Sequence, residues 1–401
     1  MSTGATSTGL TSAGRERLHE VAERYVGDGQ DPDRYQVPGL VGLVACGGDV
    51  HVEALGTMAV GGAPVRRDTI FRIASDTKPI TAAAVLALVA EGRLDLDEPV
   101  DRLLPELSSR RVLRRMDGPL DDTEPAHRAI TPRDLLTFTF GFGFMVEMFA
   151  GGPPWPVMAA EAELHLETIG PPNRDAQPDP DTWMAGLGSL PLLAQPGERW
   201  FYNTSASVLG VLAARAAGQP FGEVLRTRIF EPLGMPDTGL WTTRTERLMT
   251  AYRPSESGLV AWDQPDGSWS HPPRFGDGAA DLVSTADDLL AFSRMLLGGG
   301  SPVLPAELAR AMTTGQLTAE QKANGGLGAD FFKDKSWGFG MAVQDDGSYG
   351  WAGGFGSTWL MDPNHDLTVV MLTQRMFAGP EPEPVHTEFQ AAAYDALVSK
   401  T

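Results

Sequence analysis

The feature that most constrains this chain is the apolar run TAAAVLALVA over residues 81–90, which directly follows a Ser-x-x-Lys element. A run that is apolar on all sides is typical of a helix buried in a protein core. Gly92 follows it as a suitable helix stop. Pro79 is tolerated only in the first turn of a helix, so the helix should begin close to Ser75. The sequence therefore predicts a core built around this helix.

The Ser-x-x-Lys element places Ser75 and Lys78 three residues apart, so their side chains should share one face of the helix start. A serine is a poor nucleophile until a base takes its proton. A lysine can be that base when burial and the positive end of a helix lower its pKa. Lys78 is the only lysine of the chain with a serine three residues before it. The pattern favours a nucleophilic Ser75, and chance spacing is the alternative.

Composition excludes several classes of function. With 401 residues the chain is long enough for one large or two moderate domains. Its net charge of −20 disfavours nucleic acids and anionic membranes as partners. Cys46 is the only cysteine and no histidines are spaced as metal ligands, so neither an intrachain disulfide nor a metal site is expected. No apolar signal segment or membrane-spanning run occurs, which favours a cytoplasmic location.

The predicted strands lie at both ends of the chain. A strand-turn-strand pattern covers residues 37–60, and strands separated by Gly and Asp/Asn turns cover residues 337–343, 349–352, 357–361 and 367–374. Helices and loops fill the sequence between them. This order predicts an α+β fold in which one antiparallel sheet, built from both chain ends and flanked by helices, carries a mainly helical insertion.

The expected division of the chain follows from this order. We predict a disordered tail, an α/β domain made of two segments, a mainly helical domain between those segments, and an active site between the two domains. The bounds are residues 1–12 for the tail, 13–90 and 281–401 for the α/β domain, and 91–280 for the helical domain.

Two further clusters accompany the Ser-x-x-Lys element. Residues 198–210, ERWFYNTSASVLG, open a helix and carry Tyr202, a phenol that can relay a proton. Residues 350–363 include a glycine-rich edge strand, against which a substrate can lie closely and whose N–H groups can face an oxyanion. Residues 141–198 are expected to be loops and short helices over the site, with Phe144 and Trp155 in a substrate pocket, although they could equally cover the helical core.

These three clusters, in this order, resemble the serine β-lactamase and penicillin-binding-protein superfamily, in the branch of class C β-lactamases and family VIII carboxylesterases. Residues 131–137, 230–236 and 278–288 are also similar to that family. The resemblance implies the β-lactamase/transpeptidase-like fold. It implies that Ser75 is the acylated nucleophile and that Lys78 accepts its proton or holds the charge of the network. Tyr202 would be the general base and acid partner, and the backbone N–H groups of Ser75 and Gly354 would form the oxyanion hole.

The chain departs from the β-lactamase pattern at two places. Counted back from Gly210, the class C register places Phe201 at the tyrosine position and Asn203 at the asparagine position, whereas the esterase register selects Tyr202. Because phenylalanine has no ionisable group, we favour Tyr202, and Phe201 stays the alternative.

The second departure is at the Lys-Thr-Gly motif of β-lactamases, where this chain has Trp351-Ala352-Gly353, which is similar to family VIII esterases. No cation remains there for a substrate carboxylate, although Arg375 after the last strand could replace it. Trp351, Gly353 and Asn203 are accordingly expected to contact a neutral ester or amide.

The sequence thus predicts a serine hydrolase that forms an acyl-enzyme with a small-molecule ester or acyl substrate, most simply a carboxylesterase on short-chain or neutral esters. It implies no metal or organic cofactor and carries no signal of oligomeric state. The alternatives are an acyltransferase or transesterase on the same scaffold, then a β-lactamase or a D-amino-acid amidase or peptidase, and lastly a catalytically silent binding protein.

Overall fold

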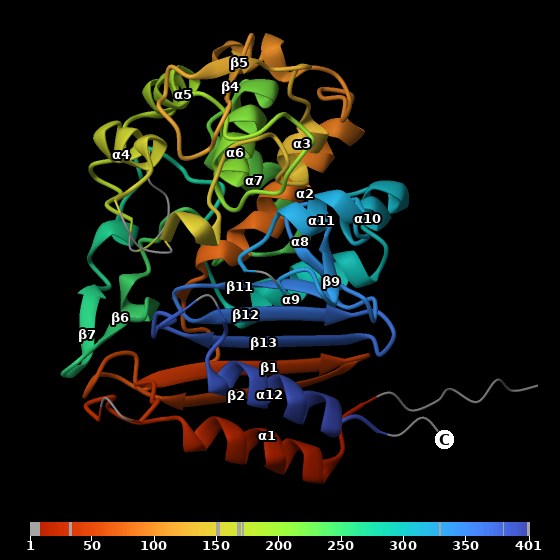
Figure 1. Ribbon diagram of the computed structural model, residues 1–401. Helices are drawn as coiled ribbons and strands as arrows, with labels where there is room; N and C mark the ends of the chain where they lie inside the picture. The colour runs from red at the N-terminus through yellow and green to blue at the C-terminus, as the bar shows by residue number, and fades with distance from the viewer. Residues whose placement is uncertain are drawn as a thin grey trace, which may run out of the picture.

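The computed structural model describes residues 9–31, 34–149, 153–166, 170, 172–328, 330–379 and 381–398, except for the side chain of Phe149. A seven-stranded sheet has the strand order β2-β1-β13-β12-β11-β10-β9, and all neighbouring strands are antiparallel (Figure 1). The predicted antiparallel sheet built from both chain ends is therefore confirmed. Its strands are β1 (Gly39–Cys46), β2 (Asp49–Gly56), β9 (Lys335–Trp337), β10 (Ala342–Gln344), β11 (Tyr349–Gly353), β12 (Ser357–Asp362) and β13 (Leu367–Thr373).

Helices cover both faces of this sheet. α1 (Ser12–Arg24) and α12 (Pro384–Asp395) lie side by side on one face, where Phe389 packs among residues of β1 and β13 (Figure 1). α9 (Ala286–Leu297) packs on the other face. Every residue of β1 is buried, which explains its continuous apolar sequence, because a strand covered on both faces has no side for polar residues.

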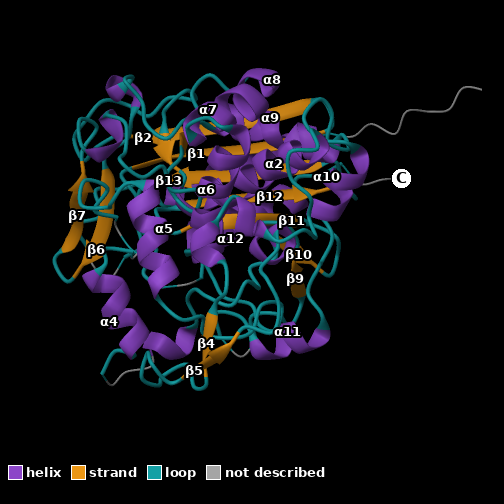
Figure 2. Cartoon of the chain, turned by 90° about the horizontal axis from the view of Figure 1, so that it is seen from above, coloured by secondary structure: helices purple, strands orange, loops and turns teal. Residues whose placement is uncertain are grey.

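The predicted central helix is α2 (Thr77–Ala90), and 12 of its 14 residues are buried. It follows a 3-10 turn at Ala74–Asp76 and packs along α6 (Thr204–Ala217). Seen from above, α2, α6 and α7 (Phe221–Leu225) lie over the sheet (Figure 2). The helix that carries Lys78 thus connects the sheet to the helical part of the molecule.

The remaining elements are short and mostly surround α2 and α6. They are β3 (Phe71–Arg72), which pairs with β8 (Val283–Ser284); the hairpins β4 (Arg111–Leu113) with β5 (Thr123–Pro125) and β6 (Ala251–Ser255) with β7 (Gly258–Asp263); and the helices α3 (Pro132–Leu136), α4 (Pro156–Glu163), α5 (Pro180–Ser189), α7 (Phe221–Leu225), α8 (Glu231–Leu233), α10 (Ala306–Met312) and α11 (Ala319–Asn324). Within the described ranges no helix is long and apolar enough to cross a membrane.

The structure corrects three expectations. Residues 1–8 of the predicted tail lie outside the described residues, but residues 9–12 belong to the fold: Leu10 pairs with Leu397, and the Thr11 side chain caps α1 by accepting from the Gly14 N–H at 2.9 Å. The single strand predicted over residues 337–343 is two strands, because the backbone turns at Gly340, where φ is 75°. The hairpin β6–β7 was not expected. The domain bounds at residues 90 and 280 stay a prediction.

Candidate active site

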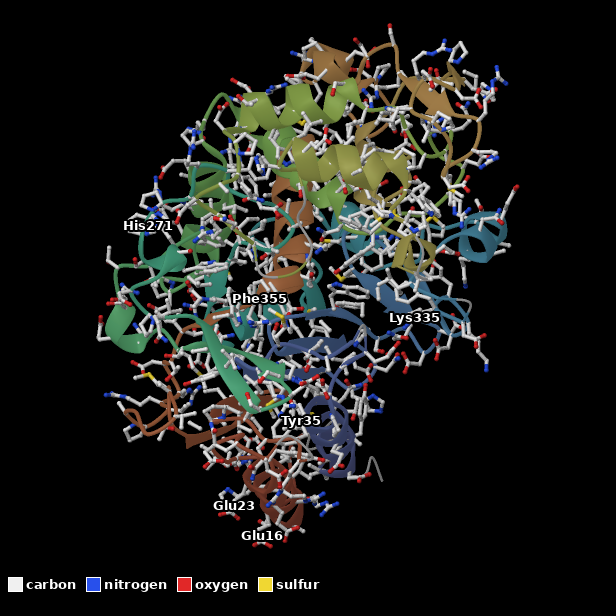
Figure 3. The ribbon with its side chains drawn as sticks, turned by 60° about the vertical axis from the view of Figure 1, so that its left-hand side comes forward. Glu16, Glu23, Tyr35, His271, Lys335 and Phe355 are labelled. Carbon is white, nitrogen blue, oxygen red and sulfur yellow. The ribbon has the colours of Figure 1, made fainter. Side chains whose placement is uncertain are left out.

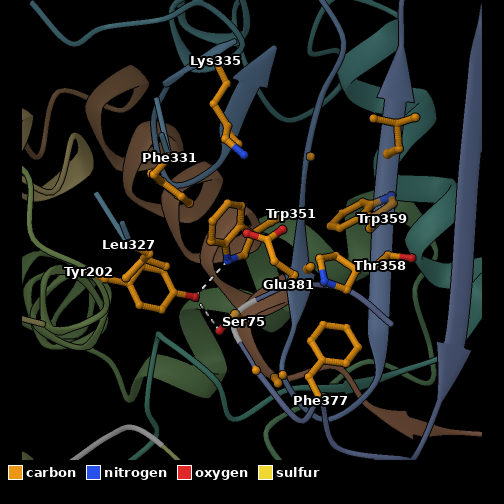
Figure 4. Close-up of a pocket in the computed structure, with 18 of the residues that line it drawn as sticks. Ser75, Tyr202, Leu327, Phe331, Lys335, Trp351, Thr358, Trp359, Phe377 and Glu381 are labelled. Atoms are coloured by element: carbon orange, nitrogen blue, oxygen red, sulfur yellow. Dashed lines mark hydrogen bonds between the residues drawn. The ribbon is translucent and has the colours of Figure 1, made fainter. Parts of the chain in front are cut away.

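A continuous set of hydrogen bonds joins side chains from three parts of the chain (Figure 4). Lys78 Nζ and Tyr202 OH lie 2.8 Å and 2.9 Å from Ser75 Oγ. Trp351 Nε1 donates to Tyr202 OH at 2.9 Å, and Lys78 Nζ donates to the Ala279 carbonyl at 2.9 Å. The structure therefore brings the predicted catalytic groups of Lys78 and Tyr202 within hydrogen-bond distance of Ser75 Oγ.

The backbone next to Ser75 and next to Tyr202 is strained. Ala74, directly before Ser75, has a φ of 44°, and Asn203, directly after Tyr202, has a φ of 76°. A non-glycine residue in this left-handed region costs about 1–3 kcal/mol and is found mostly where function requires the geometry. The two sharp turns present the Ser75 hydroxyl and the Tyr202 phenol to one another at the N-terminal ends of α2 and α6.

Burial controls the charge of Lys78. Its side chain is fully buried, and the loss of water lowers the pKa of its amine to about 7, although the nearby acids Asp277 and Asp76 act to raise it. The amine also lies 4.7 Å from the centre of the Tyr202 ring. A lysine with this pKa is neutral in about half of the molecules near pH 7, whereas an exposed lysine is almost entirely protonated.

Tyr202 stands in an aromatic cluster that keeps it neutral. The centres of the Trp200 and Trp351 rings each lie 5.8 Å from its ring centre. Burial raises the pKa of its phenol to about 12, although its hydrogen bonds with Ser75 and Trp351 act to lower it. Phe201 points elsewhere, and its ring centre lies 5.9 Å from the Arg199 guanidinium. The structure thus brings Tyr202, and not Phe201, to Ser75.

β11 lies inside the sheet by strand order, but its second half is an edge. β10 pairs only with Tyr349 and Gly350, so the strand from Trp351 onward is paired on one side alone, with β12. A free strand edge beside the nucleophile offers backbone N–H groups to a substrate. The prediction of an edge strand is correct for this half and wrong for the first half, which β10 covers.

A cavity of about 1140 Å³ opens beside Ser75. Its wall includes six of the residues predicted for the site: Ser75, Tyr202, Asn203, Trp351, Gly354 and Phe144. Much of the remaining wall is aromatic or apolar, and Phe355 and Lys335, both in the wall, lie at the level where the sheet meets the helical part (Figure 3). The described residues contain no cluster of three or more His, Cys, Asp or Glu side chains that could hold a metal ion.

The wall of this cavity does not include Lys78, Trp155, Gly353 or Arg375, which the sequence also singled out. Trp155 lines a separate cavity of about 450 Å³. Gly353 is in close contact with the turn that carries Ser75, because a Cβ added there would lie 2.2 Å from the Ile73 carbonyl oxygen. The Arg375 guanidinium lies 4.2 Å from the centre of the Tyr35 ring and donates to the Gln36 carbonyl at 2.9 Å.

Sequence reasoning missed other groups at the site. Lys335 on β9 places a cation in the cavity wall, and no spacing in the sequence links it to Ser75 (Figure 4). The Ala279 carbonyl, which accepts from Lys78, lies in the stretch 278–288 that was recognised as family-like without a role. Asp76 was visible inside the Ser-x-x-Lys element, but its partner Ser357 is 281 positions away.

Comparison with known proteins agrees with this geometry. The Beta-lactamase family model matches residues 21–393. The chain is 39% identical to Protein Rv1367c of Mycobacterium tuberculosis over 78% of this chain and 79% of that protein. It is 31% identical to Esterase EstB of Burkholderia gladioli, over 85% of this chain and 87% of that protein.

A similar solved structure is EstCE1, described as a hydrolase with promiscuous acyltransferase activity. It has a TM-score of 0.75 and 24% identity, covering 95% of this chain and 98% of that one. The family match over most of the chain agrees with the arrangement of Ser75, Lys78 and Tyr202, and the chain belongs to the Beta-lactamase family.

Proposed function

We propose that the protein is a serine hydrolase that acts through an acyl-enzyme, and that it is a carboxylesterase on short-chain or neutral esters. The observation that carries the proposal is the convergence of Lys78 Nζ and Tyr202 OH on Ser75 Oγ in the wall of an open cavity. The similarity to Esterase EstB supports the choice of an ester as substrate.

The hydrogen bonds of the site fit one direction of proton transfer. Trp351 N–H donates to the Tyr202 oxygen, and Tyr202 O–H donates to Ser75 Oγ. When Lys78 is neutral, the Ser75 O–H can donate to its Nζ, which lies 2.8 Å from Oγ. As Oγ forms a bond with the ester carbon, the serine proton moves to Lys78. The bond to the leaving alcohol then breaks, and the alcohol oxygen takes up a proton from Lys78 directly or through Tyr202.

This assignment makes Lys78 the base and Tyr202 a neutral donor. A pKa of about 7 suits the acceptor of the serine proton near neutral pH, whereas a phenol with a pKa of about 12 would be deprotonated only at high energetic cost. Deacylation uses the same groups: a water molecule loses a proton to Lys78 as it attacks the acyl carbon, and Ser75 recovers its proton as the ester bond to the enzyme breaks.

The oxyanion is assigned to the backbone N–H groups of Ser75 and Gly354. Both residues line the cavity, and Gly354 directly follows the free edge of β11. A Cβ added to Gly354 would have no heavy atom within 4 Å, so the space beside this backbone is open to a substrate. Preorganised N–H donors aimed at the developing charge supply a large part of the rate enhancement in acyl transfer.

Trp351 and the cavity wall favour uncharged substrates. The indole N–H at the position of the β-lactamase lysine is committed to Tyr202 and carries no positive charge. A desolvated carboxylate is costly without a charged partner, and a charge-assisted hydrogen bond contributes about 1.5–3 kcal/mol. Lys335 is the one cation in the described wall, alongside the acids Asp334, Asp345, Asp346 and Glu381, so it offers an anion little net attraction.

Acyl transfer to an alcohol is the second candidate, because the same acyl-enzyme serves both reactions. The observation that favours it is the size of the cavity, about 1140 Å³, which leaves room for an acceptor beside a short acyl group. Addition of a small alcohol during turnover of a p-nitrophenyl ester distinguishes the two: an acyltransferase yields mainly the new ester, and a hydrolase yields mainly the free acid.

The test of the proposed function is covalent labelling combined with a substrate panel. A fluorophosphonate should add to Ser75 in wild-type protein, as shown by peptide mass, and Ser75→Ala should lose about 10⁴-fold or more of kcat for p-nitrophenyl butyrate. Nitrocefin should be turned over far more slowly than p-nitrophenyl acetate or butyrate. Labelling at another serine would refute the nucleophile, and nitrocefin turnover above that of the esters would make a β-lactamase the better assignment.

A further inference from the structure

A buried acid stands directly beside the nucleophile and has no place in the mechanism described above. Asp76 follows Ser75 in the 3-10 turn, and its side chain is completely buried. One carboxyl oxygen, Oδ2, lies 2.6 Å from Ser357 Oγ on β12. The other, Oδ1, is buried without a hydrogen-bond partner among the described residues. A buried carboxylate with one bare oxygen is costly, so the protonation state of this group needs an explanation.

The Ser357 hydroxyl shows where the proton of this pair lies. Its oxygen is within 3.1 Å of the Ile73 carbonyl as well as 2.6 Å from Asp76 Oδ2. A hydroxyl has one proton to donate, and the Ile73 carbonyl can only accept. If Asp76 were ionised, Ser357 could serve only one of its two partners. If Asp76 is a neutral acid, its O–H donates to Ser357, and Ser357 donates to Ile73, so both contacts are satisfied.

We propose that Asp76 is a positioning residue that works as a neutral carboxylic acid, fixing the turn that carries Ser75 to the sheet through Ser357 and the Ile73 carbonyl. This inference rests on the proposed function only for its effect on activity. Gly353, paired with Ser357 across the sheet, is the point where β11 contacts the same turn, since a Cβ there would meet both Ser357 Oγ and the Ile73 oxygen within 2.3 Å.

The absence of charge on Asp76 also matters for the base. Asp76 and Asp277 are the acids whose charges act on Lys78, and burial raises the pKa of Asp277 as well. An ionised carboxylate close to an amine raises the pKa of that amine by about 1–3 units. A neutral Asp76 therefore does not raise the pKa of Lys78. Burial raises the pKa of Asp76 itself to about 8, in agreement with this state.

The test compares Asp76→Asn, Asp76→Ala and Ser357→Ala with wild type. An asparagine amide can donate to Ser357 as the neutral acid does, so Asp76→Asn should recover most of the activity that Asp76→Ala loses, a loss on the order of tenfold in kcat/KM. In Asp76→Asn, the apparent pKa at which kcat/KM falls on the acid side should differ from that of wild type by less than about half a pH unit. A downward shift of about 1–3 units would overturn the proposal, because it would reveal a negative charge beside Lys78 in the wild type.

Thermal unfolding against pH gives a readout that does not depend on catalysis. A group whose pKa is raised on folding stabilises the protein at low pH and loses that contribution as the pH rises toward the folded value. The Tm of Asp76→Asn minus that of wild type should therefore increase between pH 5 and pH 8. A difference that is constant or decreasing would refute the neutral acid. Because this measurement needs no turnover, it stays decisive even if labelling of Ser75 fails.

A matched control is Asp134→Asn. Asp134 is also buried, but it accepts hydrogen bonds from the Thr131 N–H and from Arg128, whose Nη2 lies 2.8 Å from its Oδ1. These donors suit a carboxylate. The Asp134→Asn variant should therefore have a lower Tm than wild type at every pH from 5 to 8. Equal losses of Tm in Asp76→Asn and Asp134→Asn would show that Asp76 is an ordinary ionised acid.

Discussion

Replacing Trp351 by phenylalanine separates two assignments of the general base. The change removes the indole N–H that donates to Tyr202 OH at 2.9 Å and keeps an aromatic ring in the cluster. If Tyr202 stays neutral throughout, the bond has nearly the same strength in the free enzyme and in the transition state, so its loss should lower kcat/KM by no more than its whole contribution of about 0.5–1.5 kcal/mol, or about 2- to 13-fold. If Tyr202 becomes an anion in the transition state, the bond is charge-assisted and contributes about 1.5–3 kcal/mol, or about 13- to 160-fold.

The assay is kcat/KM for p-nitrophenyl butyrate near pH 7, measured alongside Tm. Trp337→Phe is the matched control, because Trp337 belongs to the same cluster, with its ring centre 4.7 Å from that of Trp351, but its buried Nε1 has no hydrogen-bond partner among the described residues. The control should lower Tm with little change in kcat/KM. A loss above about 30-fold in Trp351→Phe, with Tm near that of the control, would refute the neutral Tyr202 and make the phenol the base.

Two further predictions concern the base and the packing of the nucleophile turn. Because only the neutral amine of Lys78 accepts a proton and its pKa is lowered to about 7, kcat/KM should fall about tenfold per pH unit below that value, and a flat profile from pH 5 to 8 would contradict the assignment. Gly353→Ala should destabilise the protein by about 1–3 kcal/mol in urea unfolding, since its Cβ would lie 2.2 Å from the Ile73 oxygen. Gly354→Ala is the control, because its added Cβ would have no heavy atom within 4 Å. Equal destabilisation by the two substitutions would show that the contact at Gly353 is not the cause.

Local spacing was enough to predict the parts of the site that lie within one turn of a helix start. The pairing of Ser75 with Lys78 follows from helical geometry, and the buried α2 follows from an unbroken apolar run. The placement of Tyr202 depended on the resemblance to the esterase branch, because the loop before α6 has no periodicity from which an orientation can be predicted.

The rest of the site depends on contacts between distant segments, which a pattern of nearby residues does not encode. Asp76 meets Ser357 only because β12 crosses the nucleophile turn. Lys335 reaches the cavity wall from the first residue of β9, which lies before the predicted strand and pairs with β10. Trp155 was assigned to the substrate pocket from the aromatic composition of its region, but composition does not decide which of two neighbouring cavities a side chain lines.

The pairing of β1 with β13 has a consequence for how the protein is made. Leu40 pairs with Thr373, so the ribosome must add about 330 more residues after β1 before the partner strand β13 exists. At 5–20 residues per second this takes roughly 15 to 70 s. During that time β2 is the only strand that can pair with β1, whose eight residues are all buried in the finished protein. The N-terminal hairpin of the nascent chain therefore carries an unpaired apolar edge, which is an aggregation hazard that a chaperone could suppress.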